Sequence, residues 1–214
     1  MAKITAIKKT KGRQQQVKVY LDGKPALALL AETALNEKLK VGVEVAEDRR
    51  ETLAETDRRQ RCYNSALQFL SYRQRSEAEI RQRLQRHGYI EAHIDKAIVR
   101  LKELGLVDDA AFARFWQENR DAFSPRSRRM TKLELKRKGL SNDVIEQVVS
   151  EIDEKDSAYR AALSRARRLP KDDYQTFRQR LTGYLGRRGF NYGIIKETTQ
   201  RVWHEVATPE VSRK

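Results

Sequence analysis

The pattern of apolar and polar residues changes character near residue 46. Before this point, apolar residues alternate with polar ones over residues 4–7 and 17–21, and this period of two is typical of half-buried β-strands. Pro25 lacks a backbone N–H donor, so a third strand beyond it is expected at a sheet edge. We therefore expect residues 1–45 to form a small β-containing N-terminal extension.

From residue 46 onward the chain is rich in helix-forming Glu, Arg, Leu, Ala and Gln. Within this region one pattern, Leu-x-basic-x-Gly, occurs three times and ends at Gly88, Gly139 and Gly189, which are 51 and 50 residues apart. An apolar or aromatic residue follows each glycine, and isoleucine comes six positions after it. Several matches at fixed offsets in three copies indicate an internal structural repeat.

Each copy reads as three short helices, because a glycine that tolerates a left-handed backbone suits the end of a helix. The predicted fold is mainly α, with three tandem three-helix repeats stacked in an elongated curved array behind the small β-containing lead-in. The expected boundaries, taken in chain order, are 1–45 for the N-terminal extension, 46–61 for a charged linking helix, 62–107 for repeat 1, 108–153 for repeat 2, 154–207 for repeat 3 and 208–214 for a flexible tail.

Composition points to a polyanionic partner. The 214 residues include 45 Lys and Arg against 30 Asp and Glu, a formal net charge of +15, and basic proteins of this kind gain affinity by releasing counterions from phosphates. The N-terminus lacks the apolar segment of a signal peptide, and no stretch is apolar enough to span a membrane. The single cysteine, Cys62, excludes an internal disulfide and favours a reducing cytoplasm.

Catalysis finds little support in the sequence. The three histidines show no metal-ligand spacing, and no glycine-rich loop carries the lysine that phosphate binding requires. The paired acids Asp108-Asp109 and Asp172-Asp173 stand at predicted helix starts, where capping explains them better than divalent-metal chemistry. We therefore predict no catalytic residue, no metal site and no cofactor.

Basic residues of the repeats are the candidates for binding nucleic acid or an anionic protein surface. The densest window, residues 126–138, contains one acid, Glu134, and helical spacing can align its cations on one face. For any single residue a solvated helix face is the simpler interpretation, whereas for this window as a group we favour binding. The candidates are Arg73, Arg75, Arg81, Arg83, Arg86, Arg126, Arg128, Arg129, Lys132, Lys136, Arg137, Lys138, Arg178, Arg187 and Arg188.

Three stretches resemble proteins of the RecX family. Residues 66–80 (ALQFLSYRQRSEAEI) are similar to the first repeat of that family, residues 104–113 (LGLVDDAAFA) to its junction with the second repeat, and residues 133–140 (LELKRKGL) to the core of the second. The N-terminal extension resembles one that some members carry. One departure is residues 124–129 (SPRSRR), where members often carry glycine.

The resemblance implies a regulator of the bacterial recombinase RecA that lies along the RecA–single-stranded DNA filament. Such proteins modulate, and usually inhibit, the ATPase, strand-exchange and co-protease activities of the filament in DNA repair and the SOS response. The implied partners are the RecA filament and single-stranded DNA, with double-stranded DNA as a second option, for a monomer in the cytoplasm. Two alternatives stay open: a general DNA- or RNA-binding helical repeat protein without a recombinase partner, and a protein–protein adaptor, for which the charge excess would be unnecessary.

Overall fold

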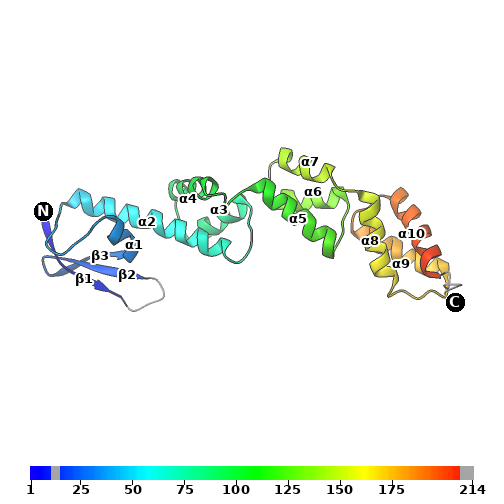
Figure 1. Cartoon of the computed structure of the whole chain (residues 1–214), viewed down its shortest axis with the longest axis horizontal. Coiled ribbons are helices and arrows are strands. Elements are labelled where there is room, and N and C mark those ends of the chain that lie inside the picture. Colours follow the sequence, from blue (N-terminus) through cyan, green and yellow to red (C-terminus); the bar gives the residue numbers. More distant parts are fainter. Residues whose placement is uncertain (11–14, 208–214) are drawn as a thin grey trace, which may run out of the picture. The chain divides into compact units, whose positions relative to one another are not determined.

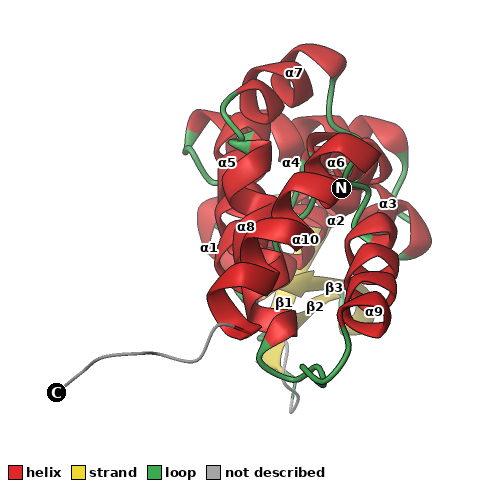
Figure 2. Ribbon diagram, turned by 90° about the vertical axis from the view of Figure 1, so that its right-hand side faces the viewer, coloured by secondary structure: helices red, strands yellow, loops and turns green. Residues whose placement is uncertain are grey.

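The computed structural model describes residues 1–10 and 15–207 and divides the chain into two compact units (Figure 1). The first unit comprises residues 1–75 and 79–107, and the second comprises residues 76–78 together with the chain from Asp108 onward. The strands all lie in the N-terminal part of the first unit, and the rest of the described chain is helices and loops (Figure 2). The predicted tail, residues 208–214, lies outside the described residues.

The N-terminal extension is an antiparallel four-stranded sheet, as its alternating pattern predicts. The strands β1 (Ala2–Lys9), β2 (Gln16–Leu21), β3 (Lys24–Leu30) and β4 (Glu44–Val45) are ordered β3-β2-β1-β4. Val17, Val19 and Leu21 of β2 are buried on one face, as a period of two requires. The strand that contains Pro25 is an edge strand, so its missing donor disturbs no inner ladder. The short helix α1 (Ala31–Asn36) follows β3.

A single helix, α2 (Glu47–Leu70), spans both the predicted linking helix 46–61 and the predicted first helix of repeat 1. No Gly or Pro interrupts this stretch, and the two halves of the helix serve different cores. Leu53 packs in the core of the sheet, whereas Cys62 and Ala66 are buried among the helices of the first repeat. The boundary predicted at residue 61 therefore does not exist as a break in the helix.

A buried acid ties α2 to the sheet. The Oδ1 atom of Asp57 accepts a hydrogen bond from the backbone N–H of Leu30 at 2.6 Å, and its Oδ2 atom pairs with Arg61 one turn along the helix. Both carboxylate oxygens are thus satisfied, which is what a charge needs to be stable at a buried position.

The first repeat consists of the C-terminal half of α2 with α3 (Glu77–Arg86) and α4 (Glu91–Glu103). Its core contains Ile80, Leu84 and Ile94, which the helical periodicity predicted as apolar contacts. Cys62 is fully buried in the same core, as expected for a small apolar residue.

The second unit contains the other two predicted repeats, each with its own core. Helices α5 (Asp109–Phe123), α6 (Arg128–Arg137) and α7 (Asn142–Ser150) form one, and α8 (Glu154–Ala166), α9 (Tyr174–Arg187) and α10 (Tyr192–Ala207) form the other. The three-helix periodicity read from the glycines is thereby confirmed. Gly88, Gly139 and Gly189 have φ values of 81°, 78° and 86°, so each adopts the left-handed conformation expected after a helix.

Helix starts in the second unit agree with the predicted capping, with one correction. Asp108 and Asp173 accept hydrogen bonds from the backbone N–H groups of the first helical turn, which accounts for the paired acids at these positions. Proline is favoured in the first turn of a helix, which would start the middle helix at Pro125. Instead α6 begins at Arg128, because Ser127 supplies the cap by accepting a hydrogen bond from the N–H of Met130.

Candidate nucleic-acid interface

The cationic window 126–138 is organised around its single acid. The Glu134 side chain, 11% exposed, pairs with Arg126 at 2.7 Å and with Arg120 of α5 at 2.8 Å. It also accepts a hydrogen bond from Nε1 of Trp116 at 2.9 Å. Arg126 thus neutralises an internal carboxylate, and the window presents fewer free cations than its sequence suggests.

Other candidates of the second unit are also engaged within the protein. The guanidinium group of Arg128 donates from Nε and Nη2 to the carbonyl oxygen of Ile152, at 2.9 and 2.7 Å. Lys132 forms an ion pair with Glu146 of α7, and the ammonium group of Lys138 lies 4.7 Å from the centre of the Trp116 ring. Of the cations that helical spacing could align on one face of this window, Arg128 and Lys132 are therefore engaged in contacts within the protein.

Arg188 has a similar internal role. Its Nη1 atom donates to Oγ of Ser124 at 2.7 Å, and its guanidinium carbon lies 4.5 Å from the centre of the Tyr184 ring. These hydrogen bonds of Arg188 connect the end of α9 to the loop before α6.

Candidates in the first unit are mostly paired. Arg73 forms an ion pair with Glu79 at 3.0 Å, and Arg81 pairs with both Glu91 and Asp95 at 2.7 Å. These contacts hold helices of the first repeat together, which explains why arginines recur there.

Two further arginines of the first unit stack on one aromatic ring. The guanidinium carbons of Arg75 and Arg83 lie 4.0 and 5.5 Å from the centre of the Phe69 ring. Burial, followed by the neighbouring charge of Arg73, lowers the pKa of Arg75 from its ordinary value. Arg75 is therefore better explained by packing than by phosphate contact.

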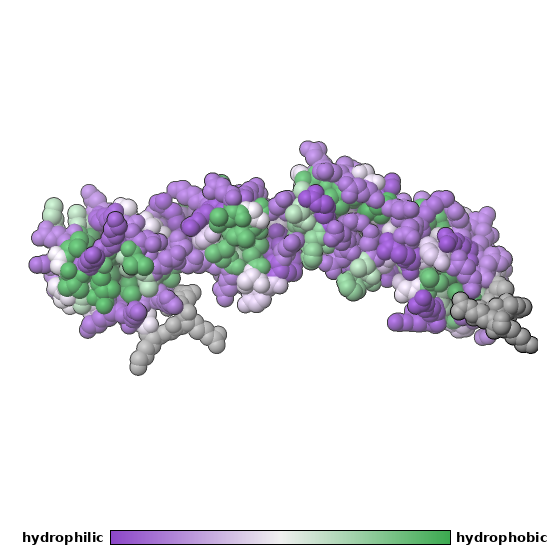
Figure 3. Space-filling view, in the orientation of Figure 1, coloured by the Kyte–Doolittle hydropathy of each residue, from purple (hydrophilic) through white to green (hydrophobic). Residues whose placement is uncertain are grey.

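A smaller group of candidates is exposed and forms no ion pair with any residue that the structure describes. These are Arg129, Lys136 and Arg137 of α6, together with Arg178 and Arg187 of α9. Arg86 is exposed as well, although it bonds to Gln82 of its own helix. Hydrophilic residues cover most of the surface in view (Figure 3).

One position of this group recurs in every repeat. Arg86, Arg137 and Arg187 each stand two residues before the repeat glycine, at the exposed end of the middle helix. A cation at a helix C-terminus gains from the helix dipole, which is a sufficient structural reason for its presence. The same position also offers phosphate groups an unpaired guanidinium in all repeats.

Sequence reasoning overlooked several exposed cations of the second unit. Arg167, Arg168 and Lys171 between α8 and α9, and Lys196 of α10 are exposed and form no ion pair among the described residues. These cations are scattered along the chain and lie outside its dense basic window. For Lys196 a signal was available, since the corresponding positions of the other repeats carry acids.

The exposed cations of α9 and α10 flank a groove of about 720 Å³ between these two helices. Its walls combine polar side chains with two tyrosine rings and one isoleucine, and they contain no acid. They are formed by Tyr174, Gln175, Thr176, Arg178, Gln179, Thr182, Tyr192, Ile195, Lys196, Thr199 and Gln200. A concave polar site of this size with two cations suits an anionic ligand better than an apolar one.

Membrane-spanning helices and clusters of metal ligands are both absent from the described residues. Among residues 1–10 and 15–207, no helix combines the length and apolar character that crossing a bilayer requires. Within the same described ranges, no three His, Cys, Asp or Glu side chains converge as metal ligands do.

Comparison with known proteins identifies relatives of the whole helical region. Family models described as the first, second and third three-helix domains of RecX match residues 62–101, 108–149 and 153–198. The Regulatory protein RecX of Clostridium beijerinckii is 30% identical, in an alignment that covers 94% of this chain and 96% of that protein. The Regulatory protein RecX of Mycobacterium avium is 37% identical over 67% of this chain and 86% of its own length.

Solved structures agree with this assignment. A crystal structure of a regulatory protein RecX superposes with a TM-score of 0.69 at 22% identity, covering 94% of this chain and all of that one (100%). The crystal structure of RecX from Lactobacillus salivarius gives a TM-score of 0.59 at 26% identity, over 69% and 97% of the two chains. With three matching repeat domains and relatives similar along nearly its full length, the chain belongs to the RecX family of regulatory proteins.

Proposed function

We propose that this protein binds the RecA–single-stranded DNA filament and inhibits its ATPase, strand-exchange and co-protease activities in DNA repair and the SOS response. It acts as a cytoplasmic monomer, without catalysis and without a cofactor. The observation that carries the proposal is the match of all three repeats to RecX domains, since its relatives are named regulatory proteins.

The charge distribution supports a filament of nucleic acid and protein as the partner. Several exposed cations of α6, α9 and α10 form no ion pair with any described residue. In addition, the net charge of +15 attracts any polyanion. Arg86, Arg137 and Arg187 recur at the same position of the three repeats, which suits a partner that is itself repetitive. Binding should weaken steeply with salt, because each phosphate contact releases counterions.

The decisive experiment measures ATP hydrolysis by RecA filaments on single-stranded DNA while this protein is added at two salt concentrations. The proposal expects inhibition at amounts of protein far below those that saturate the DNA. Inhibition that begins only when the DNA is coated, or no inhibition, would contradict it. A double-stranded oligonucleotide added as competitor reports whether duplex DNA also binds.

The alternative is a general DNA- or RNA-binding repeat protein with no recombinase partner. The equivalent cations Arg86, Arg137 and Arg187 favour it to the extent that they could contact any phosphate backbone. It differs from the main proposal in one measurable way: it expects inhibition to scale with the DNA sites occupied and to be abolished by excess free DNA.

A further inference from the structure

The third repeat departs from the other two at the positions that line the groove between α9 and α10. Seven residues before and seven residues after the repeat glycine, the first repeat carries Arg81 and Asp95, and the second carries Lys132 and Glu146. Each of these pairs forms an ion pair that joins the middle helix to the last helix of its repeat. The cross-helix ion pair is therefore part of the repeat.

In the third repeat this ion pair is absent. The corresponding residues are Thr182 and Lys196, so a neutral side chain has replaced the cation and a cation has replaced the acid. Lys196 is exposed and forms no ion pair among the described residues. Both residues line the groove, and the exchange leaves its floor with an unneutralised positive charge.

A third departure lies beside them. Ten residues after the repeat glycine, the first two repeats carry the buried apolar residues Ile98 and Val149, whereas the third carries Thr199. Thr199 lines the groove and is 2% exposed, yet its buried hydroxyl has no hydrogen-bond partner in the described structure. The third repeat thus has a polar side chain where the other two have apolar ones, and no described residue uses the hydrogen-bonding capacity of its hydroxyl.

The remaining walls indicate what kind of ligand fits. Arg178 adds a second unpaired cation, and the amides of Gln175, Gln179 and Gln200 can both donate and accept hydrogen bonds. Tyr192, at 67% exposure, leaves its ring free to stack. Cations for phosphate, amides for base edges and an exposed aromatic ring are the components of a site for unpaired nucleotides.

We propose that the groove between α9 and α10 binds one or two nucleotides of single-stranded DNA. Lys196 and Arg178 hold the phosphate, Tyr192 stacks on a base, and the Thr199 hydroxyl bonds to a polar atom of the nucleotide. The proposal deepens the function inferred above by giving the third repeat its own DNA contact. Its test uses DNA alone, so it can fail or succeed independently of any effect on RecA.

The test introduces into the third repeat the residues that the second repeat uses. The variant Thr182→Lys/Lys196→Glu should form the missing ion pair and close the groove, and Thr199→Val should remove the hydroxyl. Fluorescence anisotropy with a labelled oligothymidylate at low salt measures binding by the full-length protein. We expect the affinity to fall about tenfold for the closed variant and a few-fold for Thr199→Val. The slope of log affinity against log salt should fall by about one for the closed variant.

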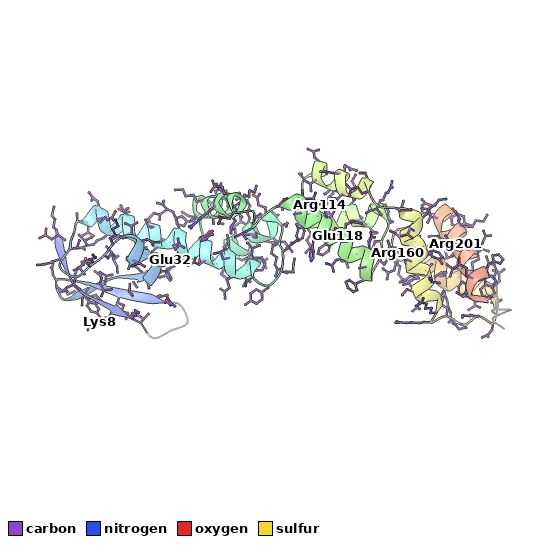
Figure 4. The ribbon with its side chains drawn as sticks, in the orientation of Figure 1. Lys8, Glu32, Arg114, Glu118, Arg160 and Arg201 are labelled. Atoms are coloured by element: carbon purple, nitrogen blue, oxygen red, sulfur yellow. The ribbon has the colours of Figure 1, made fainter. Side chains whose placement is uncertain are left out.

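Arg114→Gln is the matched control for charge. The double variant lowers the net charge by one, and so does this change at an exposed, unpaired arginine on α5 (Figure 4). Retained binding in Arg114→Gln beside lost binding in the groove variants supports the site. Equal losses in both would attribute the effect to net charge and overturn the proposal.

Two further outcomes are informative. If the closed variant binds oligothymidylate as the parent does, but no longer inhibits RecA, the groove holds an acidic segment of protein, and the assignment to DNA is wrong. If the closed variant does not fold, Lys196→Gln and Tyr192→Ala replace it, since both residues are exposed. Unchanged binding in both of these would equally exclude the site.

Discussion

The backbone N–H of Ser127 donates a hydrogen bond to the carbonyl oxygen of Arg188 at 3.1 Å, so the start of α6 meets the end of α9. The contact joins Ser127, the N-cap residue of α6, to Arg188, the C-cap residue of α9. Within the second unit, residue 76 makes the equivalent contact: Oγ of Ser76 donates to the carbonyl oxygen of Lys138 at 2.6 Å. Both serines are fully buried, and Ser127 joins the middle helices of the second and third repeats.

Next to each of these two serines, an acid accepts a further hydrogen bond from the backbone. The residue after each serine donates its backbone N–H to an acid at the first position of a later helix, Glu77 to Asp109 at 2.9 Å and Arg128 to Glu154 at 3.3 Å. A donor of a helix N-terminus that has no partner within its own helix is satisfied each time by an acid later in the chain. Polar contacts between backbone and side chain therefore join successive segments of the second unit.

The contact between α6 and the end of α9 predicts a specific cost for Gly189→Ala. A Cβ atom at this position would lie 2.3 Å from Cγ of Met130 and 2.6 Å from Oγ of Ser127, in a backbone with a φ of 86°. The left-handed backbone alone costs about 1–2 kcal/mol, and forced contacts in a packed site add roughly 1–3 kcal/mol. Calorimetric unfolding should show a loss of about 3 kcal/mol in the stability of the second unit.

Gly88→Ala separates the two contributions. Gly88 closes the middle helix of the first repeat with a φ of 81°, and a Cβ atom there would meet nothing within 4 Å. Only the backbone cost, about 1–2 kcal/mol, is expected. Equal losses of stability for the two variants would show that the contacts of the added Cβ atom at position 189 have no energetic cost.

Much of this architecture could be predicted, because the residues that define the repeat act on the backbone close to them in the chain. The glycines after the middle helices and the capping acids Asp108 and Asp173 act within a few residues of the chain, so their spacing located the helix ends. The continuity of α2 was missed for the opposite reason. Its N-terminal half looks like a solvated linker, and only the sheet against which Leu53 packs makes it part of a core.

The candidate interface was harder to predict, because pairing between charges depends on three-dimensional proximity. The sequence shows how many cations window 126–138 contains, but not which of them are paired. Glu134 forms ion pairs with Arg120 of a different helix and with Arg126 of the same window. The groove beside Lys196 could not be predicted from the residues that the repeats share. Its signal is a difference between repeats, visible only after the alignment on the glycines.

Removing the charge of Glu134 should destabilise the second unit. In Glu134→Gln, the guanidinium groups of Arg120 and Arg126 lose the carboxylate that they share with the Trp116 indole. Hydrogen bonds to charged groups contribute roughly 1.5–3 kcal/mol, and the partial exposure of both arginines reduces this, so we expect a loss of about 1–2 kcal/mol. Urea unfolding followed by tryptophan fluorescence measures it.

Glu118→Gln is the matched control for that variant. Glu118 lies on α5 (Figure 4), is exposed and forms no ion pair with described residues. Its replacement should change stability by less than about 0.5 kcal/mol. A loss for Glu134→Gln no larger than that of the control would mean that the buried cluster contributes nothing net.

Acid should weaken the first unit through Glu55. Oε1 of Glu55 lies 2.7 Å from Nε2 of the buried His93, and this hydrogen bond is the main reason why the pKa of Glu55 is below its ordinary value of 4.5. Because the folded state lowers this pKa, ionised Glu55 stabilises the protein above pH 4.5. The contribution is lost as the pH falls through the lowered folded-state value.

Glu55→Gln should therefore be less stable than the parent at neutral pH, and the two should converge in acid. Urea unfolding between neutral pH and the acid transition gives the comparison. Glu51→Gln, an exposed change on the same helix, serves as the control and should stay close to the parent throughout. A gap between Glu55→Gln and the parent that persists unchanged into acid would assign the effect to lost packing instead of lost charge.

The exposed cations of α6 should contribute to the salt dependence of filament binding. Arg129→Gln/Lys136→Gln/Arg137→Gln removes three unpaired charges while keeping good helix formers, so the fold should be retained. If all three contact phosphates, the slope of log affinity against log salt should fall by about two to three. The control Lys18→Gln/Lys24→Gln/Lys40→Gln removes the same charge from exposed positions of the N-terminal extension. Because a mere reduction of net charge would lower the slope equally in both variants, a larger fall for the α6 variant is the result that assigns these residues to the interface.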